Sequence, residues 1–395
     1  MNAKPLSWLL MLTLSVAAAA GVALGMTAQA TLRTPHLFSC FGVDGAQLEQ
    51  MAQRYDAVIW HNDPLLRQAL ARLKQWNPQV TGFMYRELFC VQREETPLAE
   101  TVGSYAWIDA HHPEWFQQDA QGRRVEVPDY PGRWMMDLGH PGWQAFWIEQ
   151  TLRDVEAGGW DGVFADDVLT SITVHHLPAL AGYTTNAALQ QAVYGFLAKA
   201  HDAFRAKGKL LVANVSGSYH FPGLWERWLA VTDGLMEEHF AGEGWTWGND
   251  VAQQQLQAMR LARQAGKWMF CFTYGQWDDR QRMSTSLAAY LIGIGPRICW
   301  SYRPPSDADK LPWDEAWAVS LGDPVGEVEI VDGLWQRRFE RGWAVVNVGR
   351  RPRVFASTQG PVLIAPQQGV VIEQHYAFGG AGKVMRSQRY TVVAE

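Results

Sequence analysis

Two short apolar runs each end in a pair of adjacent carboxylates, and the spacing from the opening Asp to one acid of the pair is the same in both. Residues 161–167 read Asp-Gly-Val-Phe-Ala-Asp-Asp, and residues 233–238 read Asp-Gly-Leu-Met-Glu-Glu. Counting five residues from each opening Asp matches Asp166 with Glu238. Two carboxyl groups that flank one glycosidic bond can cleave it when one is protonated and the other ionised. The matched acids predict chemistry of this kind.

The two acids of each pair are expected to differ in role, because neighbouring residues of a strand point to opposite faces. The spacing selects Asp166 and Glu238 as catalytic residues, with Asp166 as nucleophile or base and Glu238 as proton donor. A drier environment for one acid would raise its pKa and separate the roles. Asp167 and Glu237 then have at most a supporting role. For any one of these acids, helix capping or a loop ion pair is the alternative.

The elements that must position these acids alternate along the chain. The run before Asp166 is apolar and uncharged, which is typical of a strand buried on both faces in a parallel sheet. Similar runs alternate with helical segments, and eight strands are expected between Leu37 and Tyr302. This order predicts an α/β fold, a (β/α)8 TIM barrel, whose sites lie at the C-terminal ends of the strands. A doubly wound open sheet is the alternative, but no Gly-rich phosphate loop follows the first strand.

Two regions depart from this alternation. Residues 88–139 form a long connection with little periodicity, rich in Trp, His, Pro and Asp, and predict a lid or wall beside the site. A last helix is expected at 313–321. Beyond it, strand patterns separated by turns such as Asp332-Gly333 predict a small C-terminal all-β domain, a sandwich, over residues 323–395.

Polar and aromatic residues near strand ends are candidates for binding substrate. Side chains in a barrel mouth can hydrogen-bond sugar hydroxyls, and aromatic faces pack against the C–H faces of sugar rings. A capping or core-packing role is the alternative for each. Asn214 is the best placed of them. The candidates are Asp63, Arg86, Glu87, Trp134, Asn214, Tyr274, Trp300 and Tyr302.

Metal and nucleophilic-serine chemistry are not expected. The pairs His111-His112 and His175-His176 have no H-x-x-x-H spacing, and no G-x-S-x-G element is present. The four cysteines form no C-x-x-C, which leaves buried thiols and one disulfide as equal alternatives. We therefore expect no metal and no cofactor.

The N-terminus predicts export. Residues 1–30 hold one charge, an apolar run from Leu6 to Met26, and Ala28-Gln29-Ala30, the form that signal peptidase accepts. Cleavage near Thr31 would release a periplasmic or secreted chain without stable membrane insertion, and an uncleaved anchor is the alternative. The barrel domain then covers residues 31–322. The remaining 33 basic and 40 acidic residues give no excess of positive charge for binding nucleic acid, and we expect a monomer.

Four segments carry a family resemblance: residues 136–141, 160–167, 233–238 and 334–343. They resemble the glycoside hydrolase-like TIM-barrel proteins, most closely hypothetical glycosyl hydrolase family fifteen and more distantly the endo-α-1,4-polygalactosaminidase family. In such families the Asp that ends an Asp-Gly-Val-Phe-x-Asp element is usually the nucleophile, and a later acid is the proton donor. The resemblance thus implies these roles for Asp166 and Glu238, and it implies a reaction class without a substrate.

The sequence as a whole predicts an exported glycoside hydrolase that cleaves an oligo- or polysaccharide. Two other classes remain open. A catalytically silent saccharide-binding barrel would bind glycans without releasing reducing ends. A metal-dependent hydrolase would lose its activity to a chelator and regain it with a divalent ion.

Overall fold

The computed structural model describes residues 37–40, 47–94, 100–215, 217–242, 249–305, 313–319, 321–358 and 360–373. The expected signal peptide and its cleavage site lie outside these ranges, and the bounds of the three predicted segments stay predictions. Within the described ranges, no helix has both the length and the apolar character needed to cross a bilayer.

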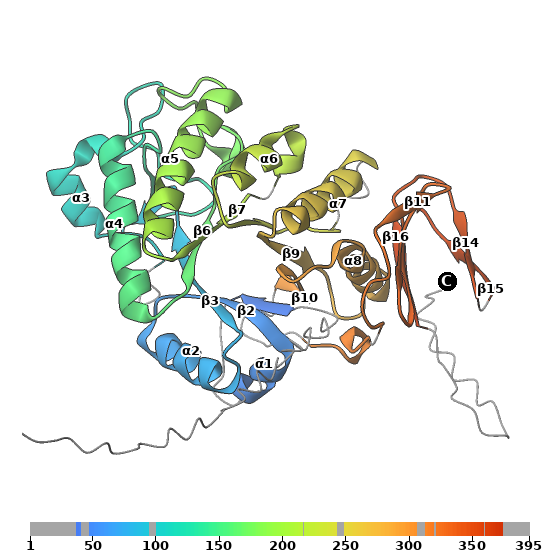
Figure 1. Ribbon diagram of the computed structural model, residues 1–395. Coiled ribbons are helices and arrows are strands. Elements are labelled where there is room, and N and C mark those ends of the chain that lie inside the picture. The colour runs from blue at the N-terminus through green and yellow to red at the C-terminus, as the bar shows by residue number, and fades with distance from the viewer. Residues whose placement is uncertain are drawn as a thin grey trace, which may run out of the picture. The chain divides into compact units, whose positions relative to one another are not determined.

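Eight parallel strands close into a barrel (Figure 1). Around the ring, each strand pairs with its neighbours in the order β1-β10-β9-β8-β7-β6-β3-β2, and Leu37 opposite Trp300 completes the closure. The predicted TIM barrel is confirmed. The strands are β1 (Leu37–Cys40), β2 (Tyr55–Trp60), β3 (Thr81–Glu87), β6 (Gly162–Asp166), β7 (Leu210–Asn214), β8 (Gly234–Glu237), β9 (Trp268–Tyr274) and β10 (Ile298–Arg303).

Helices follow the strands and surround the barrel (Figure 1). Asp63 caps one of them, α2, by accepting from the backbone N–H of Leu65 at 2.7 Å. Gly159 ends α4 with a φ of 70°, a left-handed conformation that glycine adopts without strain. The helices are α1 (Leu48–Arg54), α2 (Pro64–Trp76), α4 (Pro141–Gly158), α5 (Asn186–Ala206), α6 (Leu224–Leu229), α7 (Asn249–Gln264) and α8 (Arg280–Gly293).

The predicted helix at 313–321 is wrong. In the described residues 313–319 and 321, a single 3-10 turn, η7 (Glu315–Trp317), takes its place. Trp317 is buried and packs edge-on against Trp300 with ring centroids 5.0 Å apart. The apolar residues that suggested a helix therefore anchor an irregular segment to the barrel wall.

Alternate side chains of the strands fill the barrel interior. Phe83, Tyr85, Phe164, Met236 and Phe272 belong to one buried inner cluster. Because side chains alternate along a strand, the next inward positions toward the C-terminal ends carry polar groups. The floor of the mouth is thus apolar, and the layer above it is polar.

The opening Asp of each matched run lies at the N-terminal end of its strand, remote from the paired acids. Asp161 accepts from the backbone N–H of Gly82 at 2.7 Å, and Asp233 accepts from that of Leu211 at 2.9 Å. Each Asp thus ties its strand to the start of a neighbouring strand. The Asp that opens each of the two matched runs is therefore explained by this contact with the neighbouring strand.

The glycines that follow these Asp residues are required by close packing. A Cβ atom on Gly162 would stand 2.4 Å from the carbonyl oxygen of Leu210. One on Gly234 would stand 2.5 Å from the carbonyl oxygen of Trp268. Both strands therefore need glycine at this position, because a side chain would collide with the backbone of the next strand.

The long connection at 88–139 has more regular structure than its sequence indicates. It contains the helix α3 (Tyr105–His111), the turn η2 (Pro113–Trp115), and an antiparallel pair of strands, β4 (Cys90–Gln92) and β5 (Arg133–Met135). Cys90 lies opposite Met135 in this pair, so β5 returns the chain to the end of β3. Through this pair, β5 brings the positively charged Arg133 to the barrel mouth.

The described residues of the C-terminal part, up to residue 373, are all β, as predicted. A four-stranded antiparallel sheet contains β11 (Glu329–Val331), β12 (Leu334–Phe339), β13 (Gly342–Asn347) and β16 (Gln368–Glu373), and a two-stranded sheet contains β14 (Arg353–Ser357) and β15 (Gly360–Ile364). Leu334, Val345, Phe355 and Ile364 form a small core between them. The Arg337 guanidinium donates to the carbonyls of Ile292 and Ile294 at the end of α8, at 3.1 and 2.9 Å.

Candidate active site

Asp166 and Glu238 are joined through one amide. Asn214, the last residue of β7, donates from Nδ2 to Oδ1 of Asp166 at 2.7 Å and to Oε2 of Glu238 at 2.8 Å. Because both oxygens lie on the same nitrogen, they are at most 5.5 Å apart. The side chain of Asn214 is buried, so this bridge is held inside the mouth of the barrel.

A phenol also donates a hydrogen bond to each acid. Tyr85 in β3 donates to Oδ2 of Asp166 at 2.5 Å, and Tyr274 at the end of β9 donates to Oε1 of Glu238 at 2.8 Å. Each carboxylate therefore accepts one phenol O–H and one amide N–H. The arrangement is nearly symmetric about Asn214, so these hydrogen bonds alone do not distinguish the two acids.

A third carboxylate, Glu87, lies beside Asp166. It ends β3, is 1% exposed, and accepts from the Tyr85 hydroxyl at 3.0 Å. Arg133, brought by β5, forms an ion pair with Glu87 and a second one with Glu100 at 2.8 Å. Arg133 thus supplies positive charge to a mouth otherwise rich in carboxylates.

Asp167 does not point away from Asp166, so the expected alternation of this pair is wrong. Carboxylate oxygens of Glu87, Asp166 and Asp167 all lie within 4.8 Å of one another. Asp167 has a φ of 50°, which turns the chain out of strand geometry just after β6. Its Oδ1 lies 3.1 Å from Nε2 of His175, so His175 is its nearest cationic partner when protonated.

Glu237 and Glu238 do diverge. Glu237 belongs to β8, is fully buried, and accepts from the backbone N–H of His239 at 3.3 Å. Its neighbour Met236 lies in the inner cluster, so Glu237 faces the outer side of the strand. Burial raises the pKa of Glu237 to about 8.

The surroundings of Asp166 favour its protonated form. Burial raises the pKa of Asp166 to about 7, and the negative charges of Asp167 and Glu238 act in the same direction. The hydrogen bonds from Tyr85 and Asn214 lower it. Near neutral pH, Asp166 therefore exchanges its proton readily, which is the property that acid-base chemistry requires.

The space enclosed directly by the acid pair is small. Phe164, Met236 and Phe272 form its floor, and Asp166, Asn214, Glu238 and Tyr274 complete the lining. Its volume is about 10 Å³. That is the room of about one water molecule. A sugar ring would have to lie above the carboxylates, toward the open end of the barrel.

Three of the carboxylates are close enough to hold one cation. These are Glu87, Asp166 and Asp167. Their present partners are Arg133, Tyr85, Asn214 and His175, which already supply positive charge and hydrogen-bond donors. This donor set fits carboxylates that act on protons, and we assign no metal to it. Elsewhere, Cys90, Cys271 and Cys299 are buried free thiols, and the side chain of Cys40 is outside the described part of the chain.

The structure brings three of the eight predicted binding residues to the acids: Asn214, Tyr274 and Glu87. Arg86 instead forms an ion pair with Asp154 of α4 at 2.5 Å, because it faces the helix layer. Asp63 caps α2. The other three are placed elsewhere: Trp134 packs on Tyr105, Trp300 is fully buried beside Tyr290, and the Tyr302 hydroxyl donates to the Gln276 carbonyl.

Three residues of the site were not predicted from the sequence: Tyr85, Arg133 and His175. Tyr85 precedes Glu87 by two positions, so strand alternation could have placed both on the inner face. His175 was considered only as a metal ligand. Arg133 carries no local signal, because its partner Glu87 is 46 residues away in the sequence.

A closed parallel barrel whose mouth holds paired carboxylates defines a TIM-barrel protein of the glycoside hydrolase class. The chain belongs to hypothetical glycosyl hydrolase family 15, whose model matches residues 74–343. The matched segment contains both Asp166 and Glu238. Among curated proteins, none is significantly similar to this chain.

Solved structures share the fold at low sequence identity. The GH31 dextranase of Flavobacterium johnsoniae, complexed with glucose, has a TM-score of 0.51 and 10% identity over 87% of this chain and 52% of its own. A mutant of that dextranase with isomaltotriose has a TM-score of 0.52 and 10% identity, over 86% and 51%. A maltogenic α-amylase of Thermotoga neapolitana matches with a TM-score of 0.46 and 10% identity, over 86% and 99%. This chain thus spans about half the length of the dextranase.

Proposed function

We propose that this protein hydrolyses glycosidic bonds of an oligo- or polysaccharide with retention of configuration at the anomeric carbon. The Asn214 bridge carries this proposal. Retaining glycosidases hold their two carboxyl groups about 5 to 5.5 Å apart, whereas inverting ones leave about 6.5 to 9.5 Å for a water molecule. The limit of 5.5 Å between the bridged oxygens supports the shorter arrangement.

The position of each acid relative to the end of its strand supports Asp166 as nucleophile and Glu238 as acid and base, although the raised pKa of Asp166 taken alone would suit the proton donor. Asp166 is the last residue of β6, whereas Glu238 lies one residue beyond the end of β8. The Asp166 carboxylate attacks the anomeric carbon from below while Glu238 protonates the leaving oxygen. Water then cleaves the covalent intermediate and gives its proton to Glu238. The phenols of Tyr85 and Tyr274 orient the two carboxylates throughout.

Site variants and product stereochemistry test this proposal. We expect Asp166→Asn and Glu238→Gln to release few reducing ends from a glycan panel while keeping wild-type circular dichroism spectra. Proton NMR of the first product should show the anomer of the substrate. If both variants keep wild-type turnover, the acid pair is not catalytic; if the product is the opposite anomer, the enzyme inverts.

Saccharide binding without cleavage is the second candidate, and the small enclosed space favours it. The space directly between the acids, about 10 Å³, holds about one water molecule, so a sugar bound above them can rest at the mouth without contacting both carboxylates. Screening the wild-type protein for both binding and reducing-end release separates the two functions. Binding throughout the panel without any release would favour the silent protein.

Export is part of the proposal, supported by the apolar run and Ala28-Gln29-Ala30 at the N-terminus. The mature protein would then be periplasmic or secreted and would act as a monomer. N-terminal sequencing of the exported protein should begin at Thr31. A chain retained in the membrane with its first 30 residues would instead show an uncleaved anchor.

A further inference from the structure

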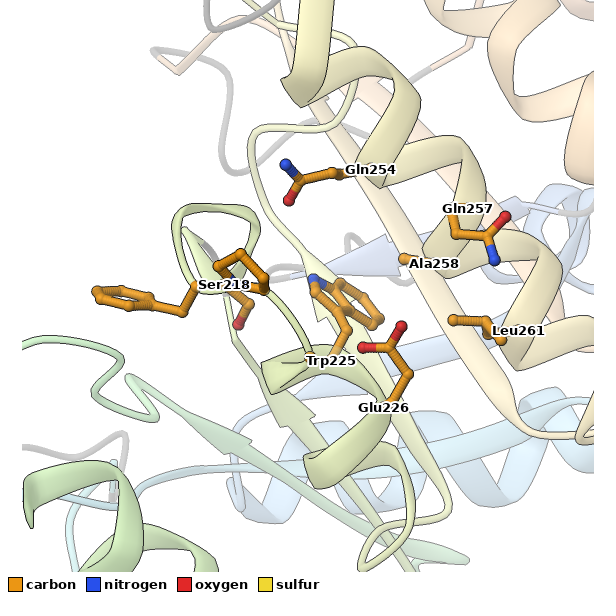
Figure 2. A pocket seen from close by; sticks show the side chains of 10 residues that line it. Ser218, Trp225, Glu226, Gln254, Gln257, Ala258 and Leu261 are labelled. Carbon is orange, nitrogen blue, oxygen red and sulfur yellow. The ribbon is translucent and has the colours of Figure 1, made fainter. Parts of the chain in front are cut away.

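A second pocket lies outside the barrel, between α7 and the segment that runs from η4 (Ser218–His220) into α6. Its volume is about 320 Å³. That is at the lower end of the range of about 300 to 1,000 Å³ found for small-molecule sites. Figure 2 shows Trp225 in the middle of the lining, with Gln254 and Gln257 on the helix α7 and Glu226 beside the indole. The lining shares no residue with the space between the acids.

The polar groups of this pocket are available for a ligand. Trp225 is 7% exposed, and its indole N–H has no hydrogen-bond partner in the described chain. That N–H is itself buried, so the polar groups open to a ligand are the side chains of Gln254, Gln257 and Glu226. Gln254 and Gln257 are half-buried, and Glu226 is exposed. Within the same described residues, their side chains form no hydrogen bond or ion pair.

The chemistry of the lining selects a neutral sugar. Two amides and a carboxylate can bind several hydroxyl groups, and the half-buried ring of Phe221 offers apolar surface for the C–H face of a pyranose. The lining contains no Lys, Arg or His, while Glu226 adds negative charge. This composition disfavours phosphates, sulfates and uronic acids.

We infer that this pocket is a second saccharide-binding site that takes a neutral pyranose unit. Its first lining residue, Ser218, lies four residues after Asn214, so the pocket begins on the same end of β7 as the acid pair. A glycan chain held here would stay close to the mouth of the barrel. Binding at this pocket does not depend on hydrolysis by Asp166 and Glu238.

The test uses full-length protein and defined neutral trisaccharides: maltotriose, isomaltotriose, cellotriose and triacetylchitotriose. Protein labelled with 15N-tryptophan reports binding through the indole signal of Trp225, assigned with Trp225→Phe. We expect at least one trisaccharide to shift this signal, and Gln254→Ala/Gln257→Ala to weaken that binding by at least roughly tenfold. Gln253→Ala, an exposed neighbour outside the lining, is the matched control and should bind as wild type.

Three results would overturn the inference. None of the four neutral trisaccharides shifts the Trp225 signal, or the double variant binds as well as the control, or trigalacturonic acid binds more tightly than the neutral sugars. The same titration with Asp166→Asn/Glu238→Gln separates the two sites. Binding at Trp225 should survive in that variant, and it should persist even if the wild-type protein hydrolyses nothing.

Discussion

The hydroxyls of Tyr85 and Tyr274 donate to different members of the acid pair, at 2.5 Å to Asp166 and at 2.8 Å to Glu238. Because a hydrogen bond to a charged group contributes about 1.5 to 3 kcal/mol, Tyr85→Phe and Tyr274→Phe should each reduce kcat by roughly 10- to 100-fold. Steady-state kinetics on the best substrate of the panel measures this. Tyr194→Phe, on the outer helix α5, serves as a control. Equal rates for all three variants would mean that the phenols do not support catalysis.

The pKa of Asp166 predicts an acid limb in the pH profile. A nucleophile must be ionised, and the ionised fraction of a group with a pKa of about 7 falls as the pH drops through 7. We expect kcat/KM to fall about tenfold per pH unit below that point. The profile of the free protein measures it directly. Activity that rises as the pH falls through 7 would reverse the roles and make Asp166 the proton donor.

Glu237 predicts a change of stability with pH that is separate from catalysis. Its folded pKa of about 8 lies above the ordinary value of 4.5, so the folded state disfavours its ionised form. The stability that the wild-type chain has relative to Glu237→Gln should therefore be greatest below pH 4.5 and decline as the pH rises toward 8. The slope is at most about 1.4 kcal/mol per pH unit. Urea unfolding at several pH values measures it, with the exposed Glu49→Gln as control, and parallel curves for wild type and Glu237→Gln would contradict it.

Arg133 and Glu87 predict a non-additive pair of substitutions. Removing the cation takes the ion-pair partner from a carboxyl that is 1% exposed, and burial already raises the pKa of that carboxyl well above its ordinary value, so Arg133→Met should destabilise the fold by about 3 kcal/mol where Glu87 is ionised and by less where it is protonated. Arg133→Met/Glu87→Gln should recover at least half of that loss, because residue 87 then carries no charge that lacks its partner. Urea denaturation of the two single variants and the double variant completes the cycle. Additive losses would show that Glu87 is already neutral in the native protein.

The bridging position of Asn214 predicts that its substitution by Asp changes the pH dependence of activity. Asn214→Asp replaces the shared donor with another acceptor beside Asp166 and Glu238, so the three carboxylates repel one another. We expect a large loss of kcat and an acid limb shifted to higher pH, with Asn214→Ala giving a smaller shift in the same direction, because it removes a hydrogen bond that lowers the pKa of Asp166 but adds no negative charge. The pH profiles of the two variants distinguish a bridge from a space-filling residue. If both variants had the same pH profile as the wild-type protein, Asn214 would only fill space.

The barrel and its acid layer were predictable because they depend on local patterns. Apolar runs in alternation with helical segments determine the eight strands, and the acids follow directly from two of those runs. The same alternation, applied to β3 and β10, would have excluded Arg86, Trp300 and Tyr302, which face the helices, and would have added Tyr85. Those placements needed only the direction of each side chain.

Two features of the site depend on information that a local pattern does not contain. Asp167 converges on Asp166 because its φ of 50° departs from strand geometry, and nothing in an Asp-Asp pair announces that departure. Arg133 reaches Glu87 through the β4–β5 pairing, a contact between distant parts of the chain. The helix expected at 313–321 failed for a related reason, since burial of Trp317 against the barrel outweighed helical periodicity.

The glycine at the start of β8 has a consequence at the far end of the strand. A one-residue slip of β8 would exchange the faces of Glu237 and Glu238. It would also place a residue with a side chain where Gly234 now lies. A Cβ atom at that position would stand 2.5 Å from the carbonyl oxygen of Trp268. Because this collision prevents the slip, Gly234 fixes the register of β8. The register in turn determines which of the two acids enters the mouth. Gly234→Ala would therefore impair turnover from the opposite end of the barrel, without touching a single group of the site.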